Sequence, residues 1–248
     1  MRVDSLARDL VDLFLPRGCL GCGERIPPED PEDLVCPRCR GGLRPPPPPY
    51  CQRCHLPLGT GHPPGEPCPE CNRWSPELIS ARSSVILDSA AGALVHALKY
   101  HGWRELANFL AGRLEKELPL GLLDPVLVPV PTTRWRQWTR GYNQAALLAG
   151  ALSVRTSIPK AEVLHRPEGR TQVRLGPRER RSNVQGAFVI QNDAGSPIRG
   201  REVILIDDVL TTGATALAAT SALVAGGADS VRLLTFARSL PYHETRGP

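Results

Sequence analysis

Two adjacent carboxylates, Asp207 and Asp208, stand where a run of four apolar residues gives way to a short polar turn. The apolar run, residues 203–206, does not alternate with polar residues, which is typical of a strand buried on both faces of a parallel sheet. Open α/β sheets bind ligands at the carboxyl ends of such strands, and we expect both acids just past the buried part of this one. Paired acids in that position suit either two sugar hydroxyls or a hydrated Mg²⁺.

The polar turn after the acids reads Thr-Thr-Gly-Ala-Thr, and the Ala- and Leu-rich run behind it predicts a helix over residues 216–225. A helix N-terminus offers unpaired N–H groups and a partial positive charge, and a glycine lets the backbone turn tightly. The pattern therefore predicts a phosphate site, formed by Thr211, Thr212, Gly213, Ala214 and Thr215.

Two plainer interpretations of this stretch are open. A buried strand followed by an ordinary polar turn would give the same residue types without a ligand. The acids could also end a strand of a nucleotide hydrolase, but such an enzyme needs a G-x-x-x-x-G-K-[ST] loop, and the sequence contains none. The order of strand, two acids, hydroxyl-rich turn and helix favours a ribose that carries a phosphate at one end.

Residues 203–215, VILIDDVLTTGAT, resemble the phosphoribosyl pyrophosphate (PRPP) motif of the type I phosphoribosyltransferases position for position. The resemblance implies a type I phosphoribosyltransferase fold, which is a mostly parallel α/β sheet flanked by helices. It also implies that Asp207 and Asp208 are catalytic and orient the ribose hydroxyls, and that residues 211–215 surround the 5′-phosphate. Mg²⁺ is expected to bind together with PRPP.

The front of the chain holds all eight cysteines, in four C-x-x-C pairs. Thirteen residues separate the first pair from the second, and thirteen separate the third from the fourth, which indicates an internal duplication. Two such pairs close a tetrahedral Cys₄ site, so the pattern predicts two structural zinc ions in a double zinc ribbon. The expected zinc ligands are Cys19, Cys22, Cys36, Cys39, Cys51, Cys54, Cys68 and Cys71.

The proline run at residues 45–49 lies between the second and third cysteine pairs. A stiff polyproline spacer favours a site made by the first and second pairs and another made by the third and fourth. His55 and His62 lie inside the second unit and could replace a cysteine, but four cysteines are already available there, and we expect neither to bind zinc. Redox-active thiols or disulfides are the weaker alternatives.

Charge is unevenly distributed along the 248 residues. Residues 1–75 hold nine arginines and ten acids, whereas residues 76–248 hold 21 basic residues and 15 acids, so the positive charge lies with the expected phosphate site. No run of eighteen apolar residues exists, and acids interrupt the stretch 1–15. We therefore expect no membrane span, no secretory signal, a short amphipathic N-terminal helix and a cytoplasmic location.

The composition changes from Pro and Cys to Ala, Leu and Val shortly after the last cysteine. This change divides the chain into a zinc ribbon domain, residues 1–75, and an α/β domain, residues 76–248. Hydrophobic patterns predict the remaining elements of the second domain. The expected strands lie at 83–87, 127–130, 161–165 and 230–236, and the expected helices at 90–100 and 104–118.

A basic stretch, residues 132–144, follows the expected strand at 127–130. We expect it to be a loop and a second anion site, with the cationic residues Arg134, Arg136 and Arg140. The aromatic residues that interleave with them are Trp135, Trp138 and Tyr142. This mixture also suits single-stranded nucleic acid, whose bases stack on aromatic rings, although the tryptophans could simply pack the loop down. In type I phosphoribosyltransferases the equivalent loop holds the pyrophosphate, and the resemblance implies that role for the three arginines.

A second loop, rich in Arg, Gly and Pro, is expected over residues 166–188. Long loops in compact enzymes are usually lids or binding loops. The type I phosphoribosyltransferases carry a flexible hood at this place in the chain order, which closes over PRPP and excludes water. The resemblance implies the same role for this loop.

Three blocks, residues 98–107, 128–144 and 171–188, together with the cysteine-rich front resemble the ComF family of competence-associated bacterial proteins over essentially the whole chain. The resemblance implies a phosphoribosyltransferase whose acceptor the sequence does not identify. It also implies a link to DNA uptake in natural transformation, with single-stranded DNA and DNA-processing proteins as partners. A binding-only alternative keeps the PRPP pocket as a sensor and uses the ribbons and the basic stretch as contacts to DNA or to other proteins.

Overall fold

The computed structural model describes residues 17–59, 61–63, 66–167, 187–190 and 197–240. The expected N-terminal helix and nearly all of the expected hood loop lie outside these residues. Within the described ranges, no helix is long and apolar enough to cross a membrane.

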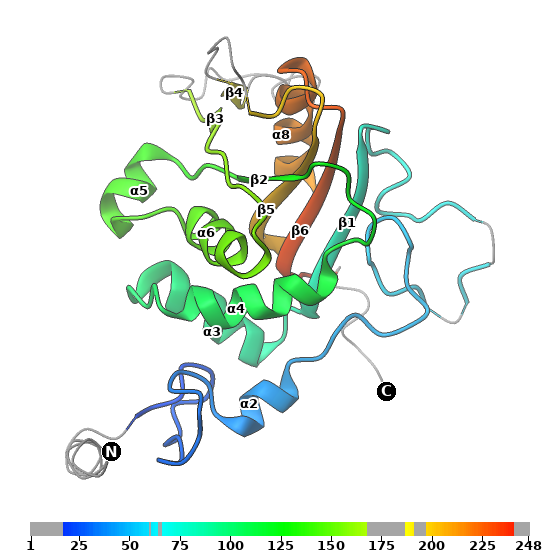
Figure 1. The fold of residues 1–248 in the computed structure, drawn as a ribbon. Coiled ribbons are helices and arrows are strands. Elements are labelled where there is room, and N and C mark those ends of the chain that lie inside the picture. Colours follow the sequence, from blue (N-terminus) through cyan, green and yellow to red (C-terminus); the bar gives the residue numbers. More distant parts are fainter. Residues whose placement is uncertain (1–16, 60, 64–65, 168–186, 191–196, 241–248) are drawn as a thin grey trace, which may run out of the picture.

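Four parallel strands form the central sheet (Figure 1). Their order across the sheet is β1 (Leu78–Ile86), β6 (Ser230–Arg238), β5 (Glu202–Leu210) and β2 (Val126–Pro129). All neighbouring pairs run parallel, and Val203 of β5 lies opposite Val126 on one side and Val231 on the other. The apolar run of β5 is completely buried, as its lack of alternation predicts. A separate antiparallel pair joins β3 (Leu164–His165) to β4 (Val189–Ile190).

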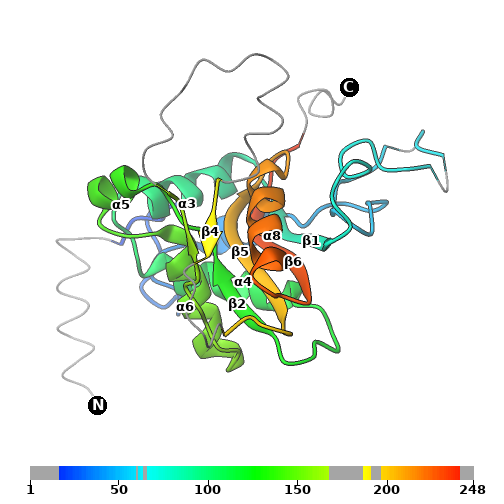
Figure 2. The same cartoon turned by 90° about the horizontal axis from the view of Figure 1, so that it is seen from above.

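Helices cover both faces of this sheet (Figures 1 and 2). One face carries α3 (Ser89–Tyr100), α4 (Leu106–Leu114) and α6 (Gln144–Thr156), and the other carries α8 (Ala214–Ala225). Successive side chains of β5 point to opposite faces of the sheet. Ile204 and Ile206 pack in the cluster of α3 and α4, whereas Val203 and Leu205 pack in the cluster of α8. The predicted mostly parallel sheet flanked by helices is confirmed.

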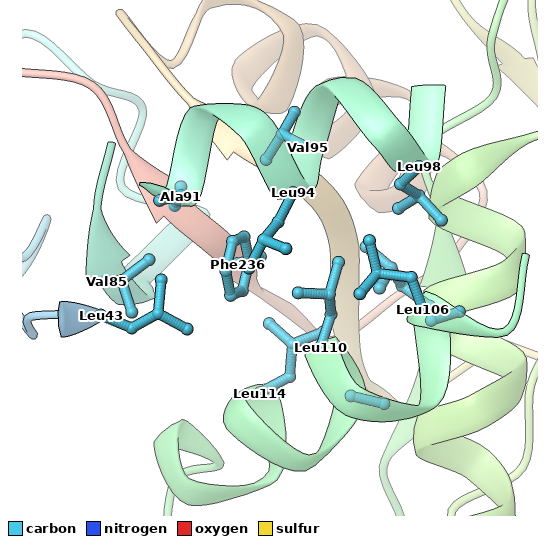
Figure 3. Packing of buried hydrophobic residues seen from close by; sticks show 14 of the residues in the cluster. Leu43, Val85, Ala91, Leu94, Val95, Leu98, Leu106, Leu110, Leu114 and Phe236 are labelled. Carbon is cyan, nitrogen blue, oxygen red and sulfur yellow. The ribbon is translucent and has the colours of Figure 1, made fainter. Parts of the chain in front are cut away.

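The core between the sheet and helices α3 and α4 is built from leucines around an aromatic ring (Figure 3). Phe236 of β6 is completely buried beside Leu94 of α3 and Leu110 of α4. Asp88 begins α3 by accepting a hydrogen bond from an N–H of the first turn, at 3.0 Å. This cap and the buried leucine stripe fix the position of α3, whose last turn carries Lys99.

The cysteine-rich front packs against the α/β part of the chain at two separate places (Figure 1). The first ribbon, which includes the short helix α2 (Pro37–Gly42), adds to the cluster of α3 and α4 the buried residues Cys19, Cys36 and Cys39. The second ribbon lies beside the edge strand β1 and adds to the cluster of α8 the buried residues Cys54, Cys68 and Cys71. Each ribbon therefore shares a hydrophobic core with a different face of the sheet.

Strand β5 is longer than its apolar run, and this corrects the expected position of the acids. Asp207 and Asp208 lie inside the strand rather than past its buried part, because the strand continues to Leu210. The equally long strand β6 supplies the backbone partners, with Thr235 opposite Asp207 and Arg238 opposite Leu210. The acids are therefore held by the sheet itself and not by a loop.

The prediction of a continuous loop over residues 132–144 is wrong, because the segment contains helix α5 (Arg134–Arg140). Thr133 begins the helix, and its side chain accepts a hydrogen bond from the N–H of Arg136. Gly141 ends it in the left-handed conformation, with φ of 76°. Good caps at both ends stabilise a helix that has no apolar stripe.

Other predicted elements are present with shifted bounds. The first strand begins five residues earlier than expected, since β1 starts at Leu78. The expected helix at 104–118 is α4 followed by a 3₁₀ turn, Glu115–Glu117, and the expected strand at 161–165 shortens to the two residues of β3. These differences fall at element ends, where the sequence pattern is weakest.

Candidate functional site

The side chains of the two acids leave β5 on different sides, as neighbouring residues of a strand do. Asp208 lies toward α3, where the Lys99 Nζ is 2.9 Å from the Asp208 Oδ2. The side chain of Asp208 is 6% exposed and that of Lys99 is 22% exposed. A carboxylate buried so deeply is costly without a counter-charge, and Lys99 supplies one.

Asp207 lies toward the N-terminus of α8, where it lines a small cavity with Thr211, Gly213 and Thr215. Its Oδ1 accepts a hydrogen bond from the backbone N–H of Asp208 at 2.9 Å. Burial of the carboxyl and, next in size, the negative charge of Asp208 raise the pKa of Asp207 to about 8. The two acids are therefore unequal, since one has a fixed cationic partner and the other exchanges a proton near neutral pH.

The turn over residues 211–215 carries the backbone from β5 into α8. Gly213 begins the helix in the left-handed conformation, with φ of 80°, and its carbonyl accepts the hydrogen bond of Leu217 N at 2.9 Å. A Cβ on Gly213 would lie 2.6 Å from the ring of Trp74, so this position requires glycine for two independent reasons. The first N–H groups of α8 have no partner inside the helix, which makes this end suitable for an anion.

A cavity of about 340 Å³ opens at the carboxyl ends of β2 and β5. It joins both acids to Thr215 of the turn and to Arg136 and Arg140 of α5. The remaining lining residues are Lys99, Tyr100, Val130, Pro131, Thr132, Gln144 and Arg166. The cavity thus unites a carboxylate pair, a helix N-terminus and several cationic groups, which is the chemistry of a site for a phosphorylated sugar.

Not every predicted site residue reaches this cavity. Thr211 and Gly213 line the small cavity beside Asp207. Thr212, Ala214 and Arg134 line neither of these two cavities. The larger cavity therefore brings together the two acids, Thr215 and two of the three predicted arginines.

The sequence pattern does not indicate several of the residues that line the cavity, among them Lys99, Gln144 and Arg166. Lys99 is a single lysine at the end of a helix, and only the tertiary contact of α3 with β5 gives it a role. Gln144 accepts a hydrogen bond from Arg140 Nη1 at 3.2 Å, which ties α5 to the start of α6. Arg166 lies over the buried ring of Phe188 at 5.1 Å, at the described edge of the predicted hood loop.

Helix α5 carries its tryptophans on the surface. Trp135 is 70% exposed and Trp138 is 83% exposed, so neither of them packs the segment down. Tyr142 is buried, and its hydroxyl donates a hydrogen bond to the carbonyl of Leu98 on α3. The interpretation that the tryptophans pack the loop down is therefore wrong, whereas Tyr142 does pack against α3.

A second cavity, of about 590 Å³, adjoins the first and shares with it Lys99, Tyr100, Arg136 and Arg140. Trp135 contributes to its lining, and the Arg140 guanidinium lies 4.6 Å from the centre of the Tyr100 ring. Stacked cations and aromatic rings are suited to planar, negatively charged ligands. The surface beside the acid pair is therefore both cationic and aromatic.

The eight cysteines form two groups, and the predicted pairing of the first pair with the second and the third with the fourth is confirmed. In each group the four sulfur atoms lie within 4.8 Å of one another. The sulfurs of Cys22 and Cys36 are 3.7 Å apart, and those of Cys54 and Cys68 are 3.6 Å apart. A tetrahedral zinc ion with Zn–S bonds of about 2.3 Å needs S–S separations of about 3.8 Å, so both groups fit zinc.

The backbone of the first ribbon is shaped around its sulfur atoms. The N–H groups of Gly21 and Cys36 donate to Cys19 Sγ at 3.3 and 3.2 Å. A Cβ on Gly21 would lie 2.9 Å from Cys39 Sγ, so a larger residue would disturb the site. Neither histidine of the second unit belongs to a group, as predicted, and His55 instead accepts a backbone hydrogen bond from β1.

A buried cation beside the second group gives independent support for zinc. Arg238, at the end of β6, is completely buried, and its three guanidinium nitrogens have no hydrogen-bond partner in the part of the chain that the structure describes. Its positive charge opposes the rise that burial causes in the pKa of Cys54, and it adds to burial and to Arg82 in lowering the pKa of His55. Four thiolates around Zn²⁺ carry a net double negative charge, which offsets the cost of burying this guanidinium.

The chain is similar to known proteins over both of its parts. The family model described as double zinc ribbon domain matches residues 10–72. Over 200 residues the chain is 31% identical to DNA utilization protein YhgH of Escherichia coli (strain K12), which covers 77% of this chain and 84% of that protein. It is 31% identical over 202 residues to Competence protein F of Haemophilus influenzae, with 77% of this chain and 85% of that protein covered.

Among solved structures, the chain is similar to glutamine phosphoribosylpyrophosphate amidotransferase from B. subtilis, with 20% identity and a TM-score of 0.37. That match covers 51% of this chain and 25% of the other.

Proposed function

This chain belongs to the ComF family, and from that membership we propose that it binds PRPP in the cavity at the carboxyl ends of β2 and β5. The observation that carries the proposal is that one cavity joins the acid pair to Thr215, Arg136 and Arg140. PRPP offers the complementary groups in the same order, since its ribose hydroxyls lie between a 5′-phosphate and a pyrophosphate. The chemistry of the cavity alone indicates a phosphorylated sugar, and membership of the family narrows this class of ligand to PRPP.

Each part of the site has a role in this proposal. The turn over residues 211–215 and the N-terminus of α8 hold the 5′-phosphate. Asp207 accepts hydrogen bonds from the ribose hydroxyls, and Asp208, paired with Lys99, completes the acidic side of the cavity. Arg136 and Arg140 face the pyrophosphate.

The proposed reaction displaces pyrophosphate from C1 of the ribose. The bond between C1 and the pyrophosphate oxygen breaks through a transition state with oxocarbenium character, and a bond from an acceptor nucleophile forms at the same carbon. Mg²⁺ bound with PRPP would neutralise charge on the leaving group. The contribution of the chain is positioning and electrostatic stabilisation, with the guanidinium groups of Arg136 and Arg140 near the departing charge and Asp207 fixing the sugar.

We further propose that helix α5 contacts single-stranded DNA. One relative is named DNA utilization protein and another Competence protein F, and the first of these names supports a link to DNA. On α5 the exposed rings of Trp135 and Trp138 alternate with arginines, so bases can stack while phosphates are neutralised. DNA-processing proteins are the corresponding class of protein partner.

Calorimetric titration of the full chain with PRPP and Mg²⁺ tests the ligand. PRPP should bind more tightly than either ribose 5-phosphate or pyrophosphate alone, because each fragment fills only part of the cavity. No binding at millimolar PRPP would overturn the proposal.

A screen of acceptors separates an enzyme from a PRPP sensor. Release of pyrophosphate in the presence of a nucleobase, an amine or ammonia supports phosphoribosyl transfer. Tight binding of PRPP without release in any reaction supports the binding-only alternative.

A further inference from the structure

We propose that the second zinc ribbon, built on Cys51, Cys54, Cys68 and Cys71, holds the turn over residues 211–215 in its ligand-binding shape. Loss of zinc from this ribbon should loosen the turn, whereas loss of zinc from the first ribbon should not. The inference rests on the proposed function only for the identity of the ligand. The coupling between the second ribbon and the turn is a property of the unliganded chain. It makes Trp74 a positioning residue for the phosphate turn.

Trp74 is the place where the ribbon reaches the turn. It follows the last zinc ligand, Cys71, by three residues and is only 6% exposed. Its ring approaches Gly213 so closely that a Cβ there would lie 2.6 Å from Cζ2 and 2.9 Å from Cε2. Trp74 lines neither cavity of the acid pair, so it supports the turn from behind rather than touching a ligand. A shift of the indole would leave the left-handed cap of α8 without its packing partner.

Arg53, which lies between two zinc ligands, fixes the segment after the last ligand. Its guanidinium donates to the carbonyls of Cys71 at 3.0 Å, Ser75 at 2.6 Å and Leu78 at 3.0 Å. Its own carbonyl accepts a hydrogen bond from the N–H of Ala81 on β1 at 2.7 Å. A single side chain therefore joins the zinc knuckle, the indole-bearing segment and the edge strand of the sheet.

Arg238 provides a second connection between the ribbon and the turn. It lies opposite Leu210, the last residue of β5 before the turn, and the N–H of Ser239 donates to the Leu210 carbonyl at 2.9 Å. On its other side Arg238 lies opposite Ile86 of β1, the strand whose Ala81 N–H donates to the Arg53 carbonyl of the ribbon. The strand ends beside the turn are therefore joined through β1 to the ribbon, and they should open more readily when the ribbon loosens.

The first ribbon offers a matched control, because it has the same zinc chemistry and different neighbours. Its buried cysteines belong to the cluster of α3 and α4, and Arg113 of α4 donates to the carbonyl of Arg40 at 2.7 Å. None of its described residues lines the cavities of the acid pair. Removing its zinc should therefore disturb α4 rather than the phosphate turn.

The test compares Cys71→Ser with Cys39→Ser, which remove the fourth ligand from the second and the first ribbon. Elemental analysis establishes which zinc each variant retains, and amide hydrogen exchange is then measured for peptides that cover residues 209–218. Exchange in these peptides should rise on the order of tenfold in Cys71→Ser and stay at the wild-type rate in Cys39→Ser. Wild-type exchange in both variants, or an equal rise in both, would overturn the inference.

Trp74→Ala keeps the test decisive if Cys71→Ser does not fold. This variant retains all eight zinc ligands, so zinc content should stay at the wild-type value while exchange of the turn rises. Trp74→Phe, which keeps an aromatic ring against Gly213, should restore most of the protection. Unchanged exchange in Trp74→Ala contradicts the role of Trp74 directly.

PRPP affinity then separates this inference from the proposed function. If wild type binds PRPP, Trp74→Ala should weaken binding by about tenfold or more, and Cys39→Ser should not. If wild type does not bind PRPP but exchange follows the predicted pattern, the ligand assignment fails and the coupling stands. Equal PRPP affinity in wild type and Trp74→Ala, together with unchanged exchange, refutes the coupling and leaves the ligand assignment intact.

Discussion

Lys99 on α3 and Asp208 on β5 form an ion pair of 2.9 Å, and both residues line the candidate PRPP cavity. The pair joins the helical layer to the strand that carries both acids. It also distinguishes the acids from each other, because Asp207 has no such cationic partner at hydrogen-bond distance among the described residues. The sheet thus holds one acid in a fixed pair and leaves the other available to a ligand.

Replacing Lys99 with methionine should destabilise the chain, because it leaves the Asp208 carboxylate buried without its counter-charge. We expect the free energy of unfolding to fall by about 2–3 kcal/mol. This is less than the usual cost of breaking a fully buried ion pair, because Lys99 is partly exposed. The double variant with Asp208→Asn should recover part of that loss. Denaturant unfolding of the full chain measures both.

Lys160→Met is the control for this change. Lys160 also forms an ion pair, at 2.8 Å with Glu162, but the side chain of Glu162 is 57% exposed, whereas that of Asp208 is 6% exposed. Its loss should change stability by no more than about 0.5 kcal/mol. Equal effects of Lys99→Met and Lys160→Met would show that the buried pair has no special role.

The two cysteine groups predict how many zinc ions each chain binds. Elemental analysis of the purified full chain should find two zinc ions per chain, and all eight thiols should be free of disulfides. The front segment has few large apolar residues, so its fold depends on the metal, and strong chelators should unfold both ribbons. A single zinc ion, or none with disulfides present, contradicts this prediction.

How much the sequence predicts depends on whether a feature is local. The zinc groups could be predicted in full because each knuckle is a short local motif and the spacing repeats. The strand, turn and helix from β5 to α8 could be predicted for the same reason. In each case the residues that act together lie within a few positions of one another.

Features that depend on tertiary contacts could not be predicted. Lys99 gains its role only when α3 packs beside β5, and no pattern around a single lysine indicates this. The contact of Trp74 with Gly213 joins residues far apart in the chain, so the ribbon looks like a separate unit in the sequence. The helix at α5 was missed because its stability comes from its caps, Thr133 and Gly141, rather than from an apolar stripe.

Trp138 should contribute to binding of single-stranded DNA if α5 is the contact surface. Trp138→Ala should weaken binding of a labelled oligothymidine by about fivefold to 150-fold, the range expected for one stacked base. Stability should change by less than about 0.5 kcal/mol, because the side chain is 83% exposed. Fluorescence anisotropy at two salt concentrations measures the affinity and its electrostatic part.

Leu123→Ala provides the control for the DNA experiment, because Leu123 is equally exposed, at 82%, and lies outside α5. It should leave DNA affinity unchanged. Substitution is a cleaner test here than deletion of residues 1–75, since deletion would also remove Trp74 from the phosphate turn. Wild-type affinity in Trp138→Ala would place the DNA contact elsewhere.

Asp207 should make stability depend on pH. Its pKa in the folded chain is raised to about 8, whereas an unfolded aspartate has a pKa of about 3.9. Between these values the folded state holds a proton that the unfolded state has lost, so the free energy of unfolding should fall as the pH rises toward 8. Thermal unfolding from about pH 6 to pH 9 should show this fall in wild type and a smaller one in Asp207→Asn. Identical slopes in the two proteins would show that Asp207 titrates normally.

Calorimetry with PRPP and Mg²⁺, on wild type and on Asp207→Asn at about pH 8.5, tests the central claim most directly, because Asp207 is then mostly ionised. Wild type should bind, and the variant should lose about tenfold to 150-fold in affinity, since charge-assisted hydrogen bonds to the ribose contribute about 1.5–3 kcal/mol. Equal affinity in the two proteins, or no binding by wild type at millimolar PRPP, would contradict the account.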